Sequence, residues 1–189
     1  MKRSTLLVLL AGLLLVGAAR AVDPGEMAPE VAGKHLLGEQ RLRLSDWRGR
    51  LVIVDFWATW CGPCVLSMPQ LDGLRSKLHA EGLQDRFEIL GVNMDDDPAR
   101  ARKFLDVRPV SYPVISDLIG LAARRYQPPK LPSAYLVGPD GRVRFIYYGH
   151  GEGYAETLES KVRELLAETA TAGEPAVRAE PVEGRPGAR

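Results

Sequence analysis

The sequence predicts an α/β fold in which helices flank a central mixed β-sheet. Strand-like and helix-like segments alternate along the chain, which favours a sheet covered by helices. The last two strand-like segments are joined by Pro139-Asp140-Gly141, a turn that favours a hairpin. Residues 51–57 (LVIVDFW) are apolar apart from one aspartate, and such a run is typical of a strand buried on both faces.

Two cysteines follow that buried strand at the point where a helix begins. Cys61 and Cys64 are separated by Gly62-Pro63, and the apolar residues after them are spaced by three or four positions, which predicts a helix over 62–81. Backbone N–H groups at a helix start lack intrahelical partners and the helix dipole is positive there, so a cysteine thiolate is stabilised. The segment therefore predicts a site that makes and breaks a disulfide.

The remaining elements are predicted on either side of this segment. A weak alternation at 39–44 predicts a short edge strand. The acidic residues 95–97 are typical of the start of a helix. In the helix predicted over 117–126, Leu118, Ala122 and Tyr126 share the inner face. In order after the cysteines, we predict a strand over 87–93, helices over 99–106 and 117–126 with a short strand over 112–116 between them, strands over 133–137 and 142–148, and a helix over 152–166.

Cysteine and histidine usage favours redox chemistry. The chain has only two cysteines, whereas a structural framework in a secreted domain normally uses more pairs. A zinc site would need two further ligands, and His35, His79 and His150 are scattered without metal-ligand spacing. A structural disulfide around two residues would restrict the unfolded chain very little. We therefore expect a catalytic disulfide, with no bound metal or other cofactor.

The ends of the chain predict export. Residues 1–21 combine a basic start, an uncharged apolar run and the small-residue pattern Ala19-Arg20-Ala21, which together are typical of a cleaved signal peptide. An uncleaved N-terminal anchor, which would tether the protein to the membrane, is the alternative. Residues 22–167 then form one domain. Residues 168–189 carry three prolines, three glycines and no aromatic residue, which predicts a disordered tail.

The charge of the exported chain argues against nucleic-acid binding. Cleavage after residue 21 removes Lys2, Arg3 and Arg20 and no acid, which leaves 22 cations and 24 acids and a net charge of −2. A near-neutral balance gives no long-range positive field for a nucleic acid or an anionic membrane surface.

The chain resembles the thioredoxin superfamily. Residues 56–64 (FWATWCGPC), with Pro69 five residues after the second cysteine, are similar to the active site of that superfamily. The lead-in at 44–50 (LSDWRGR) and the long stretch between residue 93 and Leu131 resemble its exported TlpA/ResA-like branch. The resemblance implies a thioredoxin-like fold with an N-terminal strand extension and a central insertion.

The two cysteines are expected to act differently. Cys61, at the helix tip, is expected to be exposed and to attack the disulfide of a partner protein. Cys64, about one turn further along the helix, then attacks Cys61 and releases the reduced partner. Gly62 permits close backbone approach, and Pro63 fits the first helical turn.

Further site residues are expected around the cysteines. Asp55 is a lone acid in an apolar strand, and the resemblance implies that it exchanges the Cys64 proton; a structural acid bonded to backbone is the alternative. The resemblance also implies that Pro132 is a cis-proline facing the disulfide and that the Leu131 backbone pairs with substrate. Trp57 and Trp60 frame the site, with plain core packing as the alternative.

These observations predict an exported thiol–disulfide oxidoreductase that reduces protein disulfides, with electrons from a membrane donor. An oxidant or isomerase shares the fold and differs in redox potential, which the sequence does not fix. ResA-type reductases of cytochrome c maturation often carry a glutamate where this chain has Ser67. A non-enzymatic binding module would not need both cysteines. A peroxidase would need Thr-x-x-Cys, and Thr59 lies one position too close to Cys61.

Overall fold

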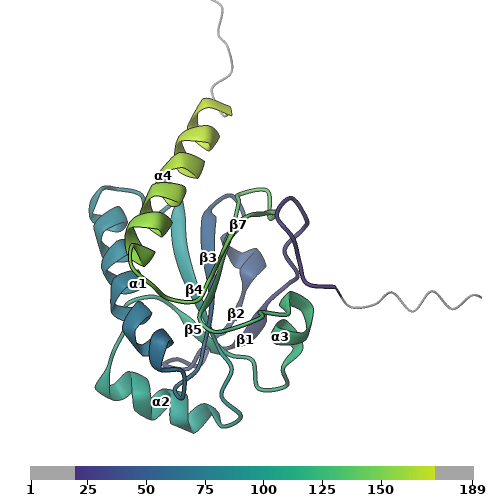
Figure 1. The fold of residues 1–189 in the computed structure, drawn as a ribbon, viewed down its shortest axis with the longest axis vertical. Coiled ribbons are helices and arrows are strands. Elements are labelled where there is room, and N and C mark those ends of the chain that lie inside the picture. Colours follow the sequence, from purple (N-terminus) through teal and green to yellow (C-terminus); the bar gives the residue numbers. More distant parts are fainter. Residues whose placement is uncertain (1–19, 173–189) are drawn as a thin grey trace, which may run out of the picture.

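A five-stranded mixed sheet forms the centre of the molecule (Figure 1). From one edge to the other, its strands are β5 (Val114–Ser116), β4 (Phe87–Asn93), β3 (Leu51–Trp57), β6 (Ser133–Val137) and β7 (Val143–Tyr148). The first three are mutually parallel, whereas β6 and β7 run antiparallel to their neighbours. The computed structural model describes residues 20–172, so nearly all of the expected signal peptide and most of the expected tail lie outside the described residues.

Strand β3 divides the core into two layers. It pairs with β4 on one side and β6 on the other, and all of its residues are buried. Ile53 and Trp57 pack into the larger core cluster, whereas Val54 and Phe56 pack into a second cluster on the opposite face. Because successive side chains of a strand alternate, Asp55 points to the same face as Ile53 and Trp57.

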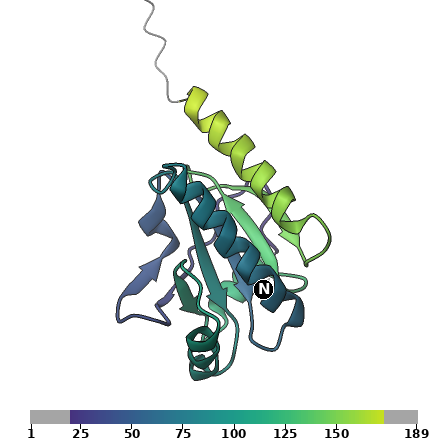
Figure 2. The ribbon, with the colours of Figure 1, turned by 90° about the vertical axis from the view of Figure 1, so that its left-hand side faces the viewer.

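Three helices cover the face to which Asp55 points: α1 (Gly62–Ala80), α2 (Pro98–Val107) and α4 (Tyr154–Ala172). Their buried apolar side chains belong to the larger core cluster, and Figure 2 shows α1 and α4 lying across the sheet on this side. The opposite face is covered by the short helix α3 (Leu121–Tyr126) and by the segment that precedes the sheet. The predicted α/β class is therefore confirmed.

The N-terminal extension is a hairpin with two strands, β1 (Ala32–Lys34) and β2 (Arg41–Arg43), followed by a 3-10 helix (Leu44–Trp47). Only the second strand was expected, because the first has no apolar alternation. The hairpin lies against β5, where the Leu36 N–H donates to the Val114 carbonyl oxygen at 2.8 Å. A Cβ atom on Gly33 would lie 2.7 Å from the Ser116 carbonyl oxygen, so a side chain there would separate the two segments.

Two helices differ from the sequence prediction. Helix α3 begins at Leu121 rather than at 117, because the Asp117 carboxylate accepts hydrogen bonds from the N–H groups of Ala122 and Ala123 and so caps the helix. Leu118 is consequently exposed, and its expected place on an inner helical face is wrong. Helix α4 continues to Ala172, so residues 168–172, expected to begin the tail, are helical.

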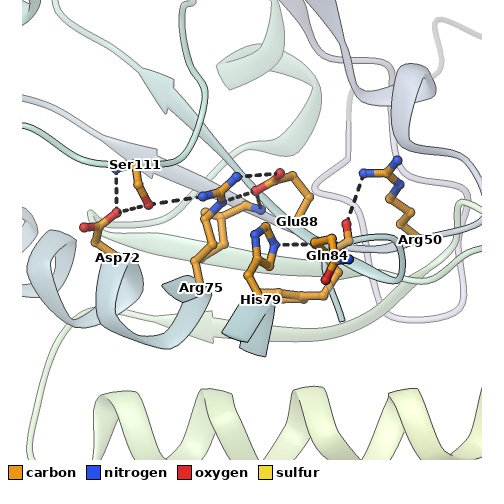
Figure 3. Close-up of polar contacts among 9 residues, drawn as sticks. Arg50, Asp72, Arg75, His79, Gln84, Glu88 and Ser111 are labelled. Carbon is orange, nitrogen blue, oxygen red and sulfur yellow. Dashed lines mark hydrogen bonds and ion pairs between the residues drawn. The ribbon is translucent and has the colours of Figure 1, made fainter. Parts of the chain in front are cut away.

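A partly buried polar network joins α1 to β4 and to the loop before β5 (Figure 3). The guanidinium of Arg75 donates to both Glu88 carboxylate oxygens, at 2.6 and 3.0 Å, and to the Ser111 hydroxyl at 3.2 Å. Asp72 accepts from the Ser111 N–H at 2.6 Å and from its hydroxyl at 2.7 Å.

None of the helices within residues 20–172 is long and apolar enough to span a membrane.

Replacing Arg75 with methionine should lower the free energy of unfolding by about 3 kcal/mol, because the Glu88 charge would stay buried without its partner. Urea denaturation of the oxidised protein measures this loss. Arg163→Met is the matched control: its ion pairs with Glu81 and Glu159 are open to water, so a much smaller loss is expected. Equal losses in the two variants would contradict the prediction.

Candidate functional site: a disulfide at a helix start

The two cysteines form a disulfide where β3 passes into α1. Cys61 is the N-cap of α1, and its Sγ accepts a hydrogen bond from the Cys64 N–H at 3.2 Å. The same donor can stabilise a thiolate on Cys61 after reduction. Cys64 is fully buried and Cys61 is only 6% exposed, so the expectation that Cys61 is exposed is wrong for the oxidised form, and the different roles of the two thiols stay a prediction.

The residues around the cysteines divide into exposed and buried ones. Trp60 is 67% exposed, whereas Trp57 is fully buried and its ring packs against Phe104 at a centroid distance of 5.7 Å. A Cβ atom on Gly62 would meet open space, so the protein's own packing does not require a glycine there. Pro63 lies in the first turn of α1, as expected.

Asp95, which the acidic run 95–97 suggested as part of a helix start, instead holds the turn before Cys61 by hydrogen bonds. Asp95 is buried and accepts hydrogen bonds from the Thr59 N–H at 3.1 Å and from the Thr59 hydroxyl at 2.8 Å. The Asn93 side-chain amide donates at 2.7 Å to the same Asp95 oxygen that accepts the Thr59 N–H. Of the acidic run, Asp97 does cap α2. The position of Asp95 just after β4 could have indicated this role. Because β3 and β4 are parallel, their carboxyl ends lie at the same sheet edge, which brings Asp95 close to the turn that follows β3.

The peptide bond between Leu131 and Pro132 is cis, as the resemblance implies, while the expectation that Pro132 faces the disulfide stays a prediction. Pro132 is buried and immediately precedes β6, whose first residue, Ser133, pairs with Phe56 near the end of β3. The cis bond therefore lies beside the strand end from which the cysteine turn departs, while its role toward a substrate stays a prediction.

Asp55 is buried at the centre of the sheet, on the face that holds Cys64. Its cross-strand partners are Gly91 in β4 and Ala134 in β6, and its exposed fraction is zero. Burial raises its pKa to about 8, because the charged carboxylate is desolvated there. Among residues 20–172, no hydrogen-bond donor reaches either carboxylate oxygen, so the alternative of a structural acid bonded to backbone does not describe this geometry.

Two of the three histidines contact buried core residues. The His79 ring nitrogen contacts the Phe87 carbonyl oxygen at 3.0 Å, and the His150 ring packs against Tyr154. Over the described range of the chain, no group of three or more His, Cys, Asp or Glu side chains is placed to hold a metal ion.

Comparison with known proteins identifies the family. Residues 24–146 match the AhpC/TSA family. Thiol-disulfide oxidoreductase ResA from Geobacillus kaustophilus is 32% identical over 155 residues, which span 79% of this chain and 86% of that protein. The structure of a protein assigned as thiol:disulfide interchange protein DsbE from Chlorobium tepidum superposes with a TM-score of 0.70 at 33% identity, covering 77% of this chain and 99% of that one.

A more distant structure shows the fold alone. It is a secreted thiol-disulfide isomerase from Corynebacterium glutamicum, with a TM-score of 0.66 at 22% identity, covering 74% of this chain and 85% of that one. The disulfide at the start of α1 fits the thiol–disulfide chemistry that the names of the more similar proteins state. The chain therefore belongs to the AhpC/TSA family and is a thiol–disulfide oxidoreductase of the thioredoxin fold, similar to ResA.

Proposed function

We propose that the protein is an exported reductase of protein disulfides that works through the Cys61–Cys64 dithiol. The observation that carries the proposal is the disulfide at the start of α1 with Asp55 buried behind it, at a pKa of about 8. A buried acid that titrates near neutral pH is suited to exchange a proton with a thiol on the same face of the sheet.

The first step is attack on the partner. In the reduced enzyme the Cys61 thiolate, stabilised by the Cys64 N–H and the start of α1, attacks one sulfur of the partner's disulfide. The partner's S–S bond breaks, a mixed disulfide forms on Cys61, and the displaced thiolate takes a proton from solvent. The exposed Trp60 and the Leu131 backbone border this approach, and Pro132 offers no N–H to the sulfurs.

The second step releases the partner. Cys64 gives its proton to the Asp55 carboxylate, and the resulting thiolate attacks the Cys61 sulfur. The mixed disulfide breaks, the partner leaves with its second thiolate, and the Cys61–Cys64 disulfide forms. Two electrons have then passed from the enzyme dithiol to the partner. A membrane thiol–disulfide donor, reached outside the cytoplasm because residues 1–21 act as an export signal, returns the pair to the dithiol form.

The electrostatics near the disulfide favour a reductant over an oxidant or isomerase. The residues between the cysteines, Gly62 and Pro63, offer no side-chain donor to a thiolate, and a negative charge on Asp55 disfavours one nearby. Ser67 is buried and its hydroxyl donates to the Cys64 carbonyl oxygen at 3.0 Å, so it supplies no carboxylate beside the disulfide. A general protein-disulfide reductant therefore fits better than a dedicated cytochrome c maturation enzyme.

The redox potential tests the direction of electron flow. We expect a value nearer to the thioredoxin potential of about −270 mV than to the DsbA potential of about −120 mV. Equilibration against glutathione buffers, with the dithiol fraction followed by alkylation and mass spectrometry, measures it. A midpoint above about −180 mV, the value of disulfide isomerase, would assign the protein to the oxidant or isomerase class instead.

The two thiols should differ in reactivity. In the reduced protein Cys61 should alkylate first, with a pKa below the usual value of about 8.5, because it caps the helix. Cys64 should react far more slowly because it is fully buried. The single variants Cys61→Ser and Cys64→Ser, alkylated over a range of pH, provide the comparison, and equal rates would reverse the assigned roles.

Asp55→Asn should slow release of the mixed disulfide by about 100-fold and leave its formation nearly unchanged, because the amide cannot accept the Cys64 proton. In the native enzyme the release rate should rise with pH to about 8, where Asp55 titrates, and this rise should be lost in the variant. Stopped-flow single turnovers with a disulfide peptide separate the two steps. Equal slowing of both steps would assign Asp55 a structural role only.

The same substitution should change how stability depends on pH. The pKa of Asp55 is raised from 3.8 to about 8, so between these values the folded chain holds a proton that the unfolded chain has lost, and stability falls as pH rises. Asp55→Asn should therefore match the native protein near pH 4 and exceed it increasingly up to pH 8, by at most about 5 kcal/mol. Urea denaturation at several pH values measures the difference, and a constant difference would contradict the raised pKa.

A further inference from the structure

The ring of Tyr112 lies next to the cross-strand neighbour of Asp55. Asp55 faces a glycine, Gly91, on β4 and an alanine, Ala134, on β6, which are the two smallest residue types. A Cβ atom on Gly91 would lie 3.2 Å from Tyr112 Cε2 and 3.4 Å from Trp57 Nε1. The carbon that bears the Tyr112 hydroxyl adjoins Cε2, so the polar edge of this ring lies next to the position of the Asp55 side chain.

A second buried tyrosine belongs to the same core cluster as Tyr112. Tyr154 begins α4, is buried, and belongs to the core cluster that contains Cys64. Its ring is held between those of Tyr147 and His150, at centroid distances of 5.1 and 5.2 Å. Burial and then the charge of Asp55 raise the pKa of both tyrosines, whereas the Ser67 side chain lowers the pKa of Tyr154.

The polar groups that meet here lack other partners. Both Asp55 carboxylate oxygens, the hydroxyls of Tyr112 and Tyr154, and Trp57 Nε1 are buried, and none has a hydrogen-bond partner within residues 20–172. Buried polar groups are normally hydrogen-bonded, because leaving them without partners is costly. One acceptor group and several donors buried in the same core layer can be satisfied through a shared water molecule.

The loop that carries Tyr112 is anchored to α1. The preceding residue, Ser111, is bonded to Asp72 through its N–H and its hydroxyl, and Arg75 donates to the same hydroxyl (Figure 3). These contacts set the position of the tyrosine relative to the helix that begins with the cysteines. The charge of Asp72 also raises the pKa of Tyr112. The pKa of Asp55 itself is raised by burial.

We propose that Tyr112 and Tyr154 are positioning residues for the disulfide exchange, whose hydroxyls are linked to the Asp55 carboxylate by hydrogen bonds through one shared water molecule. The proposal rests on the proposed role of Asp55 as the acceptor of the Cys64 proton. Hydrogen bonds to a carboxylate favour its charged form, so the two tyrosines counteract burial and keep Asp55 able to take up and release a proton near neutral pH.

The test replaces each tyrosine with phenylalanine, which keeps the ring and removes the donor. The carbon-13 shift of the Asp55 carboxyl, followed against pH in the oxidised protein, reports its pKa without any catalytic turnover. Each variant should raise this pKa by about one unit. Tyr126→Phe is the matched control: Tyr126 is equally buried but lies in the cluster on the opposite face, where its hydroxyl donates to the Pro29 carbonyl oxygen, so no shift is expected.

A variant with the opposite expectation strengthens the test. Difluorotyrosine at position 112 has a more acidic hydroxyl, which is a better donor, so it should lower the Asp55 pKa. The pH profile of mixed-disulfide release should move with the Asp55 pKa in every variant. An Asp55 pKa unchanged in both phenylalanine variants would overturn the proposal. If the pKa shifts as expected while the redox potential is oxidising, the tyrosine cluster stands and the reductase proposal fails.

Discussion

The pairing of β3 on both of its edges is the constraint on which the site depends. A strand bonded to β4 and β6 and covered on both faces cannot change register without moving its whole apolar set, so its carboxyl end is fixed. The turn that carries Cys61 departs from that end. Asp95, which holds the turn through Thr59, follows the end of β4, and Pro132 precedes β6. Three adjacent strands thus contribute the parts of one small site.

Much of this arrangement could be predicted because it is encoded locally. The strands over 51–57, 87–93 and 133–137 have the predicted bounds, since their apolar runs admit no other buried element. The start of α1 followed from the apolar spacing after the cysteines, and the cis bond at Pro132 followed from a resemblance rather than from any physical property of the nearby residues. Strong local patterns and recognisable motifs were therefore sufficient for the framework of the site.

The rest could not be predicted because it depends on segments far apart in the chain. Thr59 and Asp95 are 36 residues apart, and an acidic run before a helix gave a sufficient local explanation for Asp95. The inward face of Tyr154 was predictable from helical spacing, but the effect of Asp55 and Tyr112 on its hydroxyl arises only through the packing of α4 on the sheet. Leu118 was misplaced because the capping of α3 by Asp117 shortens that helix.

The segment that precedes β3 also protects the sheet from self-association. An open edge strand presents unpaired backbone groups that can recruit another chain into a growing β-structure. Here the hairpin bonds to β5 through Leu36 and bridges Ile115, while Gly25 and Glu26 bond to Val143 at the start of β7 on the other edge. Both edges are thus partly occupied by the same N-terminal stretch, so truncating it would expose two templates for aggregation at once, even though the cysteines lie elsewhere.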